Sequence, residues 1–107
     1  MSYKFMRVLV LFDLPTNTKG ERRAASQFRH FLLNDGFDML QYSVYSRICA
    51  DRDSANTHLM RVKRNAPDKG SVRLMMVTEN QFINMHVICG EKTTQEIAVT
   101  SDQLAFF

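Results

Sequence analysis

The stretch from Phe5 to Phe12 constrains the fold more than any other part of the chain. It is almost continuously apolar and rich in Val, Leu and Phe, a pattern typical of a central β-strand with both faces covered. Asp13 ends the run, and residues 14–17 have the composition of a turn because Pro15 cannot continue a strand ladder. We therefore expect an internal strand that ends on a carboxylate.

Two later segments have the periodicity of amphipathic helices. The first runs from Thr18 to Asn34, before an Asp35-Gly36 stop, and its apolar stripe is Ala24, Phe28, Phe31 and Leu32. The second runs from Asp51 to Asn65, with an aspartate as cap and an inner stripe of Ala55, Leu59 and Val62. Each helix has one apolar face to bury and one polar face that carries arginines.

The remaining apolar segments are interpreted as strands at 39–48, 71–78 and 85–89, with a short further strand at 97–100. These elements together favour an α+β chain of the ferredoxin-like βαββαβ class, with an antiparallel sheet, two helices on one face and a short C-terminal strand. The other face of the sheet then needs a cover. Pairing of two sheet faces in a homodimer is the simplest cover.

The composition is that of one soluble globular domain. The chain has 107 residues, of which 45% are hydrophobic and 23% charged, so we expect a single domain over 1–107 with a core at about 5–90. The segment at about 91–107 ends in the apolar Leu104–Phe107 and is expected to contact the dimer partner or another protein. No apolar run is long enough for a membrane span, and the two cysteines, Cys49 and Cys89, are interpreted as buried thiols. We therefore expect a cytoplasmic protein.

Asp13 is the residue that most strongly indicates chemistry. A carboxylate held at the end of a buried strand could bind a hard cation such as Mg²⁺, and a two-fold axis nearby would supply a second carboxylate. The alternative is that Asp13 accepts backbone N–H bonds and caps the turn that follows. Composition alone favours the turn cap.

Basic residues are the second candidate feature. The net charge is only +3, but residues 52–73 contain six basic residues and two acids. On charge and position we expect phosphate contacts at Arg22, Arg23, Arg29, Arg47, Arg61 and Arg64. The alternative is that these arginines form solvated helix faces.

Other kinds of site find little support in the sequence. The histidines have no informative spacing to a cysteine or serine, and His30 and His58 are interpreted as surface residues. The four glycines, at positions 20, 36, 70 and 90, are too scattered for a phosphate-binding loop. No cofactor-binding motif is therefore expected.

Five motifs in order resemble one known family. They are VLVLFDLP at residues 8–15, FRHFLLNDGF at 28–37, QYSVY at 41–45, the PDKG turn with VRL at 67–74, and TENQF at 78–82. Together they are similar to the CRISPR adaptation endonucleases known as CRISPR-associated protein two. The combination, which spans roughly residues 5–90, is far more specific than any single motif.

The resemblance implies a ferredoxin-like dimer in which Asp13 of each copy binds Mg²⁺ across the two-fold axis. Members of the family are described as metal-dependent endonucleases on RNA or double-stranded DNA, so the resemblance assigns Asp13 both a catalytic and a metal-binding role. It also implies a central dimer that bridges the CRISPR integrase and binds the prespacer DNA during spacer acquisition.

Three alternatives remain open on the sequence. The first is a ribonuclease toxin of the same fold, which shares the early aspartate. The second is a non-catalytic nucleic-acid-binding scaffold in which Asp13 is structural. The third is a regulatory domain that binds a small molecule, which predicts a ligand pocket and no affinity for nucleic acid.

Overall fold

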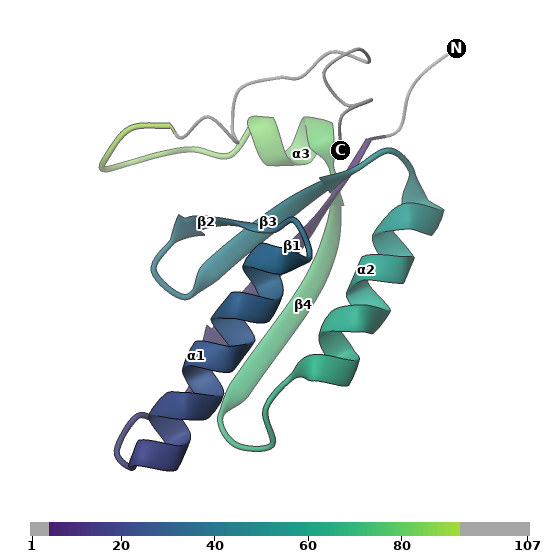
Figure 1. Cartoon of the computed structure of the whole chain (residues 1–107). Helices are drawn as coiled ribbons and strands as arrows, with labels where there is room; N and C mark the ends of the chain where they lie inside the picture. Colours follow the sequence, from purple (N-terminus) through teal and green to yellow (C-terminus); the bar gives the residue numbers. More distant parts are fainter. Residues whose placement is uncertain (1–4, 93–107) are drawn as a thin grey trace.

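In the computed structural model, residues 5–92 are described, and they form one antiparallel sheet with helices on both faces (Figure 1). The elements are β1 (Met6–Asp13), α1 (Lys19–Asn34), β2 (Asp38–Gln41), β3 (Val44–Cys49), α2 (Arg52–Asn65), β4 (Ser71–Thr78) and α3 (Glu79–Ile83). The strand order is β2-β3-β1-β4. The βαββαβ order and the antiparallel sheet confirm the predicted ferredoxin-like class.

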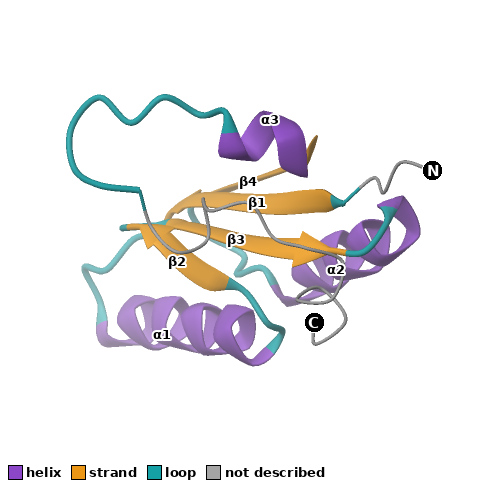
Figure 2. Ribbon diagram, turned by 90° about the horizontal axis from the view of Figure 1, so that it is seen from above, coloured by secondary structure: helices purple, strands orange, loops and turns teal. Residues whose placement is uncertain are grey.

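The two faces of the sheet are covered to different extents. Helices α1 and α2 lie together on one face, and the short α3 lies on the other (Figure 2). Along β1, the residues Met6, Val8, Val10 and Phe12 are buried in the main core, whereas Leu9 and Leu11 between them are only half-buried. We call the face opposite α1 and α2 the open face. The expectation that β1 has both faces covered therefore holds for one face and only in part for the other.

Both long helices begin at a capping side chain. The hydroxyl of Thr18 accepts the N–H of Glu21, and the Glu21 carboxylate accepts the N–H of Thr18 in return. The hydrogen bond that the Glu21 carboxylate accepts from the backbone N–H of Thr18 is the main reason why the pKa of this exposed carboxyl is lowered. Helix α1 buries Ala25, Phe28 and Leu32, so its buried stripe contains Ala25 in place of the predicted Ala24.

The segment expected to be one strand over 39–48 is a hairpin. Strand β2 ends at Gln41, β3 begins at Val44, and the turn between them places Ser43 at φ 64°. The carbonyl of Ser43 accepts the N–H of Phe12 at 3.1 Å, which fixes the turn against β1. The prediction was wrong because the turn contains no Gly, Pro or Asn, and left-handed backbone is uncommon for other residues.

The C-terminal part of the described chain also differs from the prediction. Residues 79–83 form α3, which begins with a second capping box between Thr78 and Gln81. Residues 85–89, expected to be a strand, form an irregular loop, and Cys89 on this loop is exposed while Cys49 is buried. The strand expected at 97–100 and the apolar end of the chain lie outside the described residues. None of the helices within residues 5–92 is long and apolar enough to cross a membrane.

Candidate functional site

Asp13 lies at the end of the central strand with its carboxylate exposed. Its Cα partner across the sheet is Ser71, the first residue of β4. Because side chains alternate along a strand, Asp13 shares the open face with Leu9 and Leu11, away from α1 and α2. Within residues 5–92 the carboxylate takes part in no hydrogen bond or ion pair, so the described chain gives the turn-capping alternative no support.

Asp13 lines a surface pocket of about 180 Å³. Its lining comes from the ends of β1 and β4 and consists of Leu11, Phe12, Asp13, Ser71 and Arg73. Arg73 is the Cα partner of Leu11 and is exposed on the same face as Asp13. Neither Ser71 nor Arg73 is predictable as a site residue from the sequence, because only the pairing register of β1 with β4 reveals that they lie beside Asp13.

The turn between α2 and β4 packs against the backbone of Asp13. Gly70 has φ 96°, which side-chain-bearing residues rarely adopt, and a Cβ added there would lie 2.7 Å from the carbonyl oxygen of Asp13. The turn therefore approaches β1 more closely than any residue but glycine allows. This contact makes Gly70 part of the framework that positions the carboxylate.

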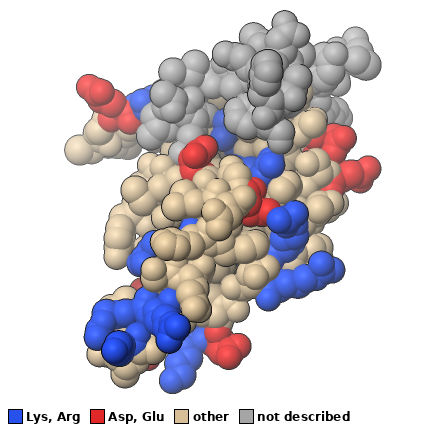
Figure 3. Space-filling model, viewed as in Figure 1, with Lys and Arg blue, Asp and Glu red and all other residues tan. Residues whose placement is uncertain are grey.

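The arginines of α1 lie in the helical layer, on the other side of the sheet from Asp13. Arg22 and Arg23 are exposed in the first turns of the helix, and Arg29 is half-buried farther along. The Nη1 of Arg22 donates to the carbonyls of Thr16 and Asn17, at 3.1 and 3.3 Å. Figure 3 shows the blue cluster of basic side chains around the N-terminal end of α1.

Two of the other predicted phosphate contacts are used inside the chain. The Nε and Nη1 of Arg47 donate to the carbonyls of Asp35 and Ile48, each at 2.8 Å, and the guanidinium lies against Gly36. The Nη2 of Arg61 lies 2.6 Å from Asp35 Oδ1 while its side chain stays half-exposed. The structure therefore gives Arg47 a packing role.

Asp35 is the centre of a buried polar cluster that joins the two long helices. Its carboxylate, only 2% exposed, contacts Arg61 through Oδ1 and accepts a hydrogen bond from His58 Nδ1 at 2.8 Å through Oδ2. Since a carboxylate can only accept, Nδ1 carries the proton. The interpretation of His58 as a surface residue was therefore wrong, whereas His30 is exposed as expected.

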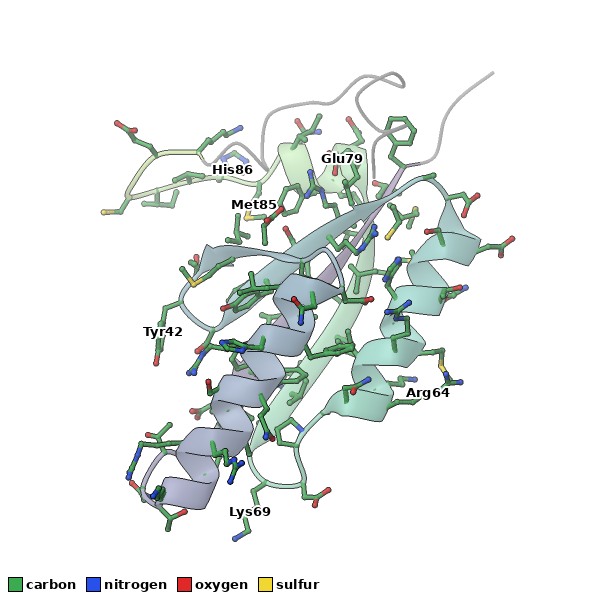
Figure 4. The ribbon with its side chains drawn as sticks, in the orientation of Figure 1. Tyr42, Arg64, Lys69, Glu79, Met85 and His86 are labelled. Carbon is green, nitrogen blue, oxygen red and sulfur yellow. The ribbon has the colours of Figure 1, made fainter. Side chains whose placement is uncertain are left out.

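Arg64, at the C-terminal end of α2, is exposed and points away from the sheet into solvent (Figure 4). Tyr42 also points outward, from the tip of the β2–β3 hairpin (Figure 4). The predicted site residues thus fall into two groups. Asp13 is on the open face, and the arginines that remain accessible are on the helices behind it.

Residues 5–92 of a single chain provide few side chains that could bind a metal ion. Residues 5–92 contain no group of three or more His, Cys, Asp or Glu side chains that could hold one. Asp13 and the Ser71 hydroxyl are oxygen donors, and Mg²⁺ is commonly held by one or two carboxylates together with waters and substrate phosphates. The Asp13 pocket fits that kind of magnesium site and does not fit a site built from protein ligands alone.

Comparison with known proteins gives a consistent result. A family model described as CRISPR associated protein Cas2 matches residues 6–85. A protein of Acidovorax ebreus named CRISPR-associated endoribonuclease Cas2 is 50% identical over 102 residues, which cover 95% of this chain and 100% of that protein. Proteins with the same name from Flavobacterium psychrophilum and Streptococcus mutans are each 43% identical, over 98% and 94% of this chain and 90% and 92% of theirs.

Proposed function

Because the chain belongs to the CRISPR-associated Cas2 family, we propose that it is a metal-dependent endonuclease that hydrolyses phosphodiester bonds, with RNA as its first substrate class. The observation that carries this proposal is the carboxylate of Asp13, which is exposed on the open face with no hydrogen bond to any residue from 5 to 92. The names of the relatives, which call them endoribonucleases, support the choice of RNA.

We propose that Asp13 holds Mg²⁺ in the pocket together with substrate phosphate oxygens. A magnesium ion held there by Asp13 would supply positive charge that neutralises the phosphate and makes water a stronger nucleophile. Asp13 is the only ionisable oxygen acceptor among the pocket-lining residues, and the Ser71 hydroxyl opposite it can donate to a phosphate oxygen or orient water.

A homodimer through the open faces completes the proposal. The face has half-buried apolar side chains at Leu9 and Leu11, and Met75 on β4 is 48% exposed. Pairing two such faces would bury this apolar surface and bring a second Asp13 toward the first. Each chain would then contribute one carboxylate to a shared magnesium site.

A second function is proposed from the charge on the helices. Five of the predicted phosphate contacts have exposed or half-buried side chains on the helical layer, away from the open face: Arg22, Arg23, Arg29, Arg61 and Arg64. On a dimer they would provide two outward-facing basic surfaces suited to the backbone of double-stranded prespacer DNA. In this role the chain would be a cytoplasmic scaffold that bridges CRISPR integrase subunits during spacer acquisition, and cleavage would not be needed.

Substitution of Asp13 separates the two functions. We expect Asp13→Ala to abolish Mg²⁺-dependent RNA cleavage by the purified chain, because no other carboxylate lines the pocket. If spacer acquisition in cells persists with Asp13→Ala, the scaffold function is independent of catalysis. Loss of both would make the carboxylate essential to adaptation, and undiminished cleavage would refute Asp13 as the catalytic residue.

A further inference from the structure

Arg73 is an exposed arginine whose donors are unused within the described chain. Between residues 5 and 92 its guanidinium forms no hydrogen bond and no ion pair. Its Cα partner is Leu11, and the next pair along that face is Asp13 with Ser71, so Arg73 lies diagonal to Asp13. Diagonal neighbours of an antiparallel pair lie about 7–8 Å apart, which is within reach of a long side chain.

The pocket therefore joins one carboxylate and one guanidinium that do not neutralise each other. An ion pair would place their charged atoms within 4 Å, and the structure has no such pair between Asp13 and Arg73. By contrast Arg7, on the same face at the other end of β1, is buried and bound to Glu79 at 2.7 Å. Arg73 is thus the one cation lining the pocket, with its five N–H donors directed to no acceptor in residues 5–92.

An anionic substrate beside Asp13 requires such a cation. A phosphodiester placed next to a carboxylate is repelled unless positive charge lies nearby. A Mg²⁺ ion shared by two Asp13 carboxylates would offset only part of the combined negative charge of both carboxylates and the phosphate. The planar guanidinium of arginine offers two parallel N–H donors that match two phosphate oxygens. Helices α1 and α2, which carry most of the predicted arginines, lie on one face of the sheet (Figure 2), and Asp13 and Arg73 belong to the opposite face.

We infer that Arg73 binds a phosphate of the nucleic acid in the Asp13 pocket, on the opposite side of that phosphate from the carboxylate. The inference rests on the proposed binding of nucleic acid at Asp13, and it goes further because it assigns substrate positioning to β4. Ser71, which lies opposite Asp13 and two residues before Arg73 on β4, provides a further donor to the same phosphate. The site accordingly binds the sugar-phosphate backbone and reads no base sequence.

The test is a salt titration of binding to a fluorescein-labelled single-stranded RNA of about 20 nucleotides. It uses the full chain without divalent ions, so that binding is measured apart from cleavage. The variants are Arg73→Gln, Arg73→Lys, and Lys63→Gln as the matched control, since Lys63 is an exposed cation on α2 away from the pocket. A phosphate contact adds about 0.7 to the slope of log affinity against log salt for a single strand.

We expect Arg73→Gln to lower that slope by about 0.7, while Lys63→Gln leaves it unchanged. Arg73→Lys keeps the charge and the slope but loses the paired donors, so RNA cleavage with Mg²⁺ should fall about tenfold or more in both Arg73 variants. An unchanged slope in Arg73→Gln overturns the inference even if the wild-type chain cleaves RNA. The inference is also overturned if Arg73→Gln changes the oligomeric mass of the protein and leaves the slope unchanged, since Arg73 would then contact the second copy. If the wild type cleaves nothing but the slope falls as expected, the proposed nuclease activity fails and the phosphate contact stands.

Discussion

The ion pair beneath α3 allows the sharpest prediction about stability. Arg7 and Glu79 are 3% and 8% exposed, and they form a two-pronged contact with Nε–Oε1 at 2.7 Å and Nη2–Oε2 at 3.1 Å. The guanidinium also lies over the ring of Phe82, with its carbon 4.4 Å from the ring centre. This pair and ring attach α3 to the open face.

We expect Glu79→Ala to lower the free energy of unfolding by about 3 kcal/mol. Removal of one partner of a buried ion pair typically costs about 3–5 kcal/mol, because the other charge stays in a poorly solvated place. The lower end applies here because the cation–π contact with Phe82 remains and is worth about 1 kcal/mol. Against a total stability of about 5–15 kcal/mol for an ordinary domain, such a loss is easy to measure.

The assay is urea unfolding followed by far-ultraviolet circular dichroism at one fixed protein concentration, since association would shift the midpoint. Glu91→Ala, which removes an exposed glutamate, is the control and should change stability by less than about 0.5 kcal/mol. The double change Arg7→Met with Glu79→Leu should recover most of the loss, because an apolar pair avoids the desolvation cost. The reasoning would be refuted if Glu79→Ala lowered the free energy of unfolding by less than about 1 kcal/mol, or if the double variant were less stable than Glu79→Ala.

Three further predictions follow from the fold. Gly70→Ala should destabilise the chain by about 1–3 kcal/mol in urea unfolding and reduce cleavage, because the added Cβ meets the Asp13 carbonyl; wild-type behaviour would mean that the turn adjusts freely. Asp35→Asn should lower the free energy of unfolding by about 2 kcal/mol, since one hydrogen-bond acceptor of the helix cluster becomes a donor. Arg61→Gln, at a half-exposed position, should lower it by less. Burial raises the pKa of the Cys49 thiol, so its contribution to stability is complete below the ordinary thiol pKa of about 8.5 and decreases as the pH rises above it. Urea midpoints should therefore fall more between pH 7 and about pH 9.5 in the wild type than in Cys49→Ala, and equal falls would contradict this.

Much of the fold was predictable from local patterns. The apolar run that became β1, the 3.6-residue stripes of α1 and α2 and the alternation in β4 each depend on one segment and its solvent exposure. The hairpin turn at Ser43 was missed because its left-handed residue is stabilised by a contact with Phe12, which is distant in sequence. The sequence did not predict helix α3 for a similar reason, since a helix of 5 residues depends on tertiary packing.

The candidate site was predictable only in part. Asp13 could be chosen because a carboxylate at the end of an apolar strand is unusual, and the ordered motifs identified the family correctly. Arg73 and Gly70 were missed because their proximity to Asp13 depends on the register of β4 against β1. Arg47 resembled a surface arginine in the sequence, and only the structure reveals that it binds backbone carbonyls between α1 and β3.

The central claim is that Asp13 holds a metal ion in a site completed by a second copy of the chain. The most direct test is a crystal structure of the full chain grown with Mn²⁺, in which the metal is located by its anomalous scattering. We expect a dimer through the open faces, metal density beside Asp13, and the two Asp13 carboxylates within about 10 Å of each other, given metal–oxygen bonds near 2 Å and bridging waters. Carboxylates on separate surfaces of the dimer, with no metal beside either, would contradict the account.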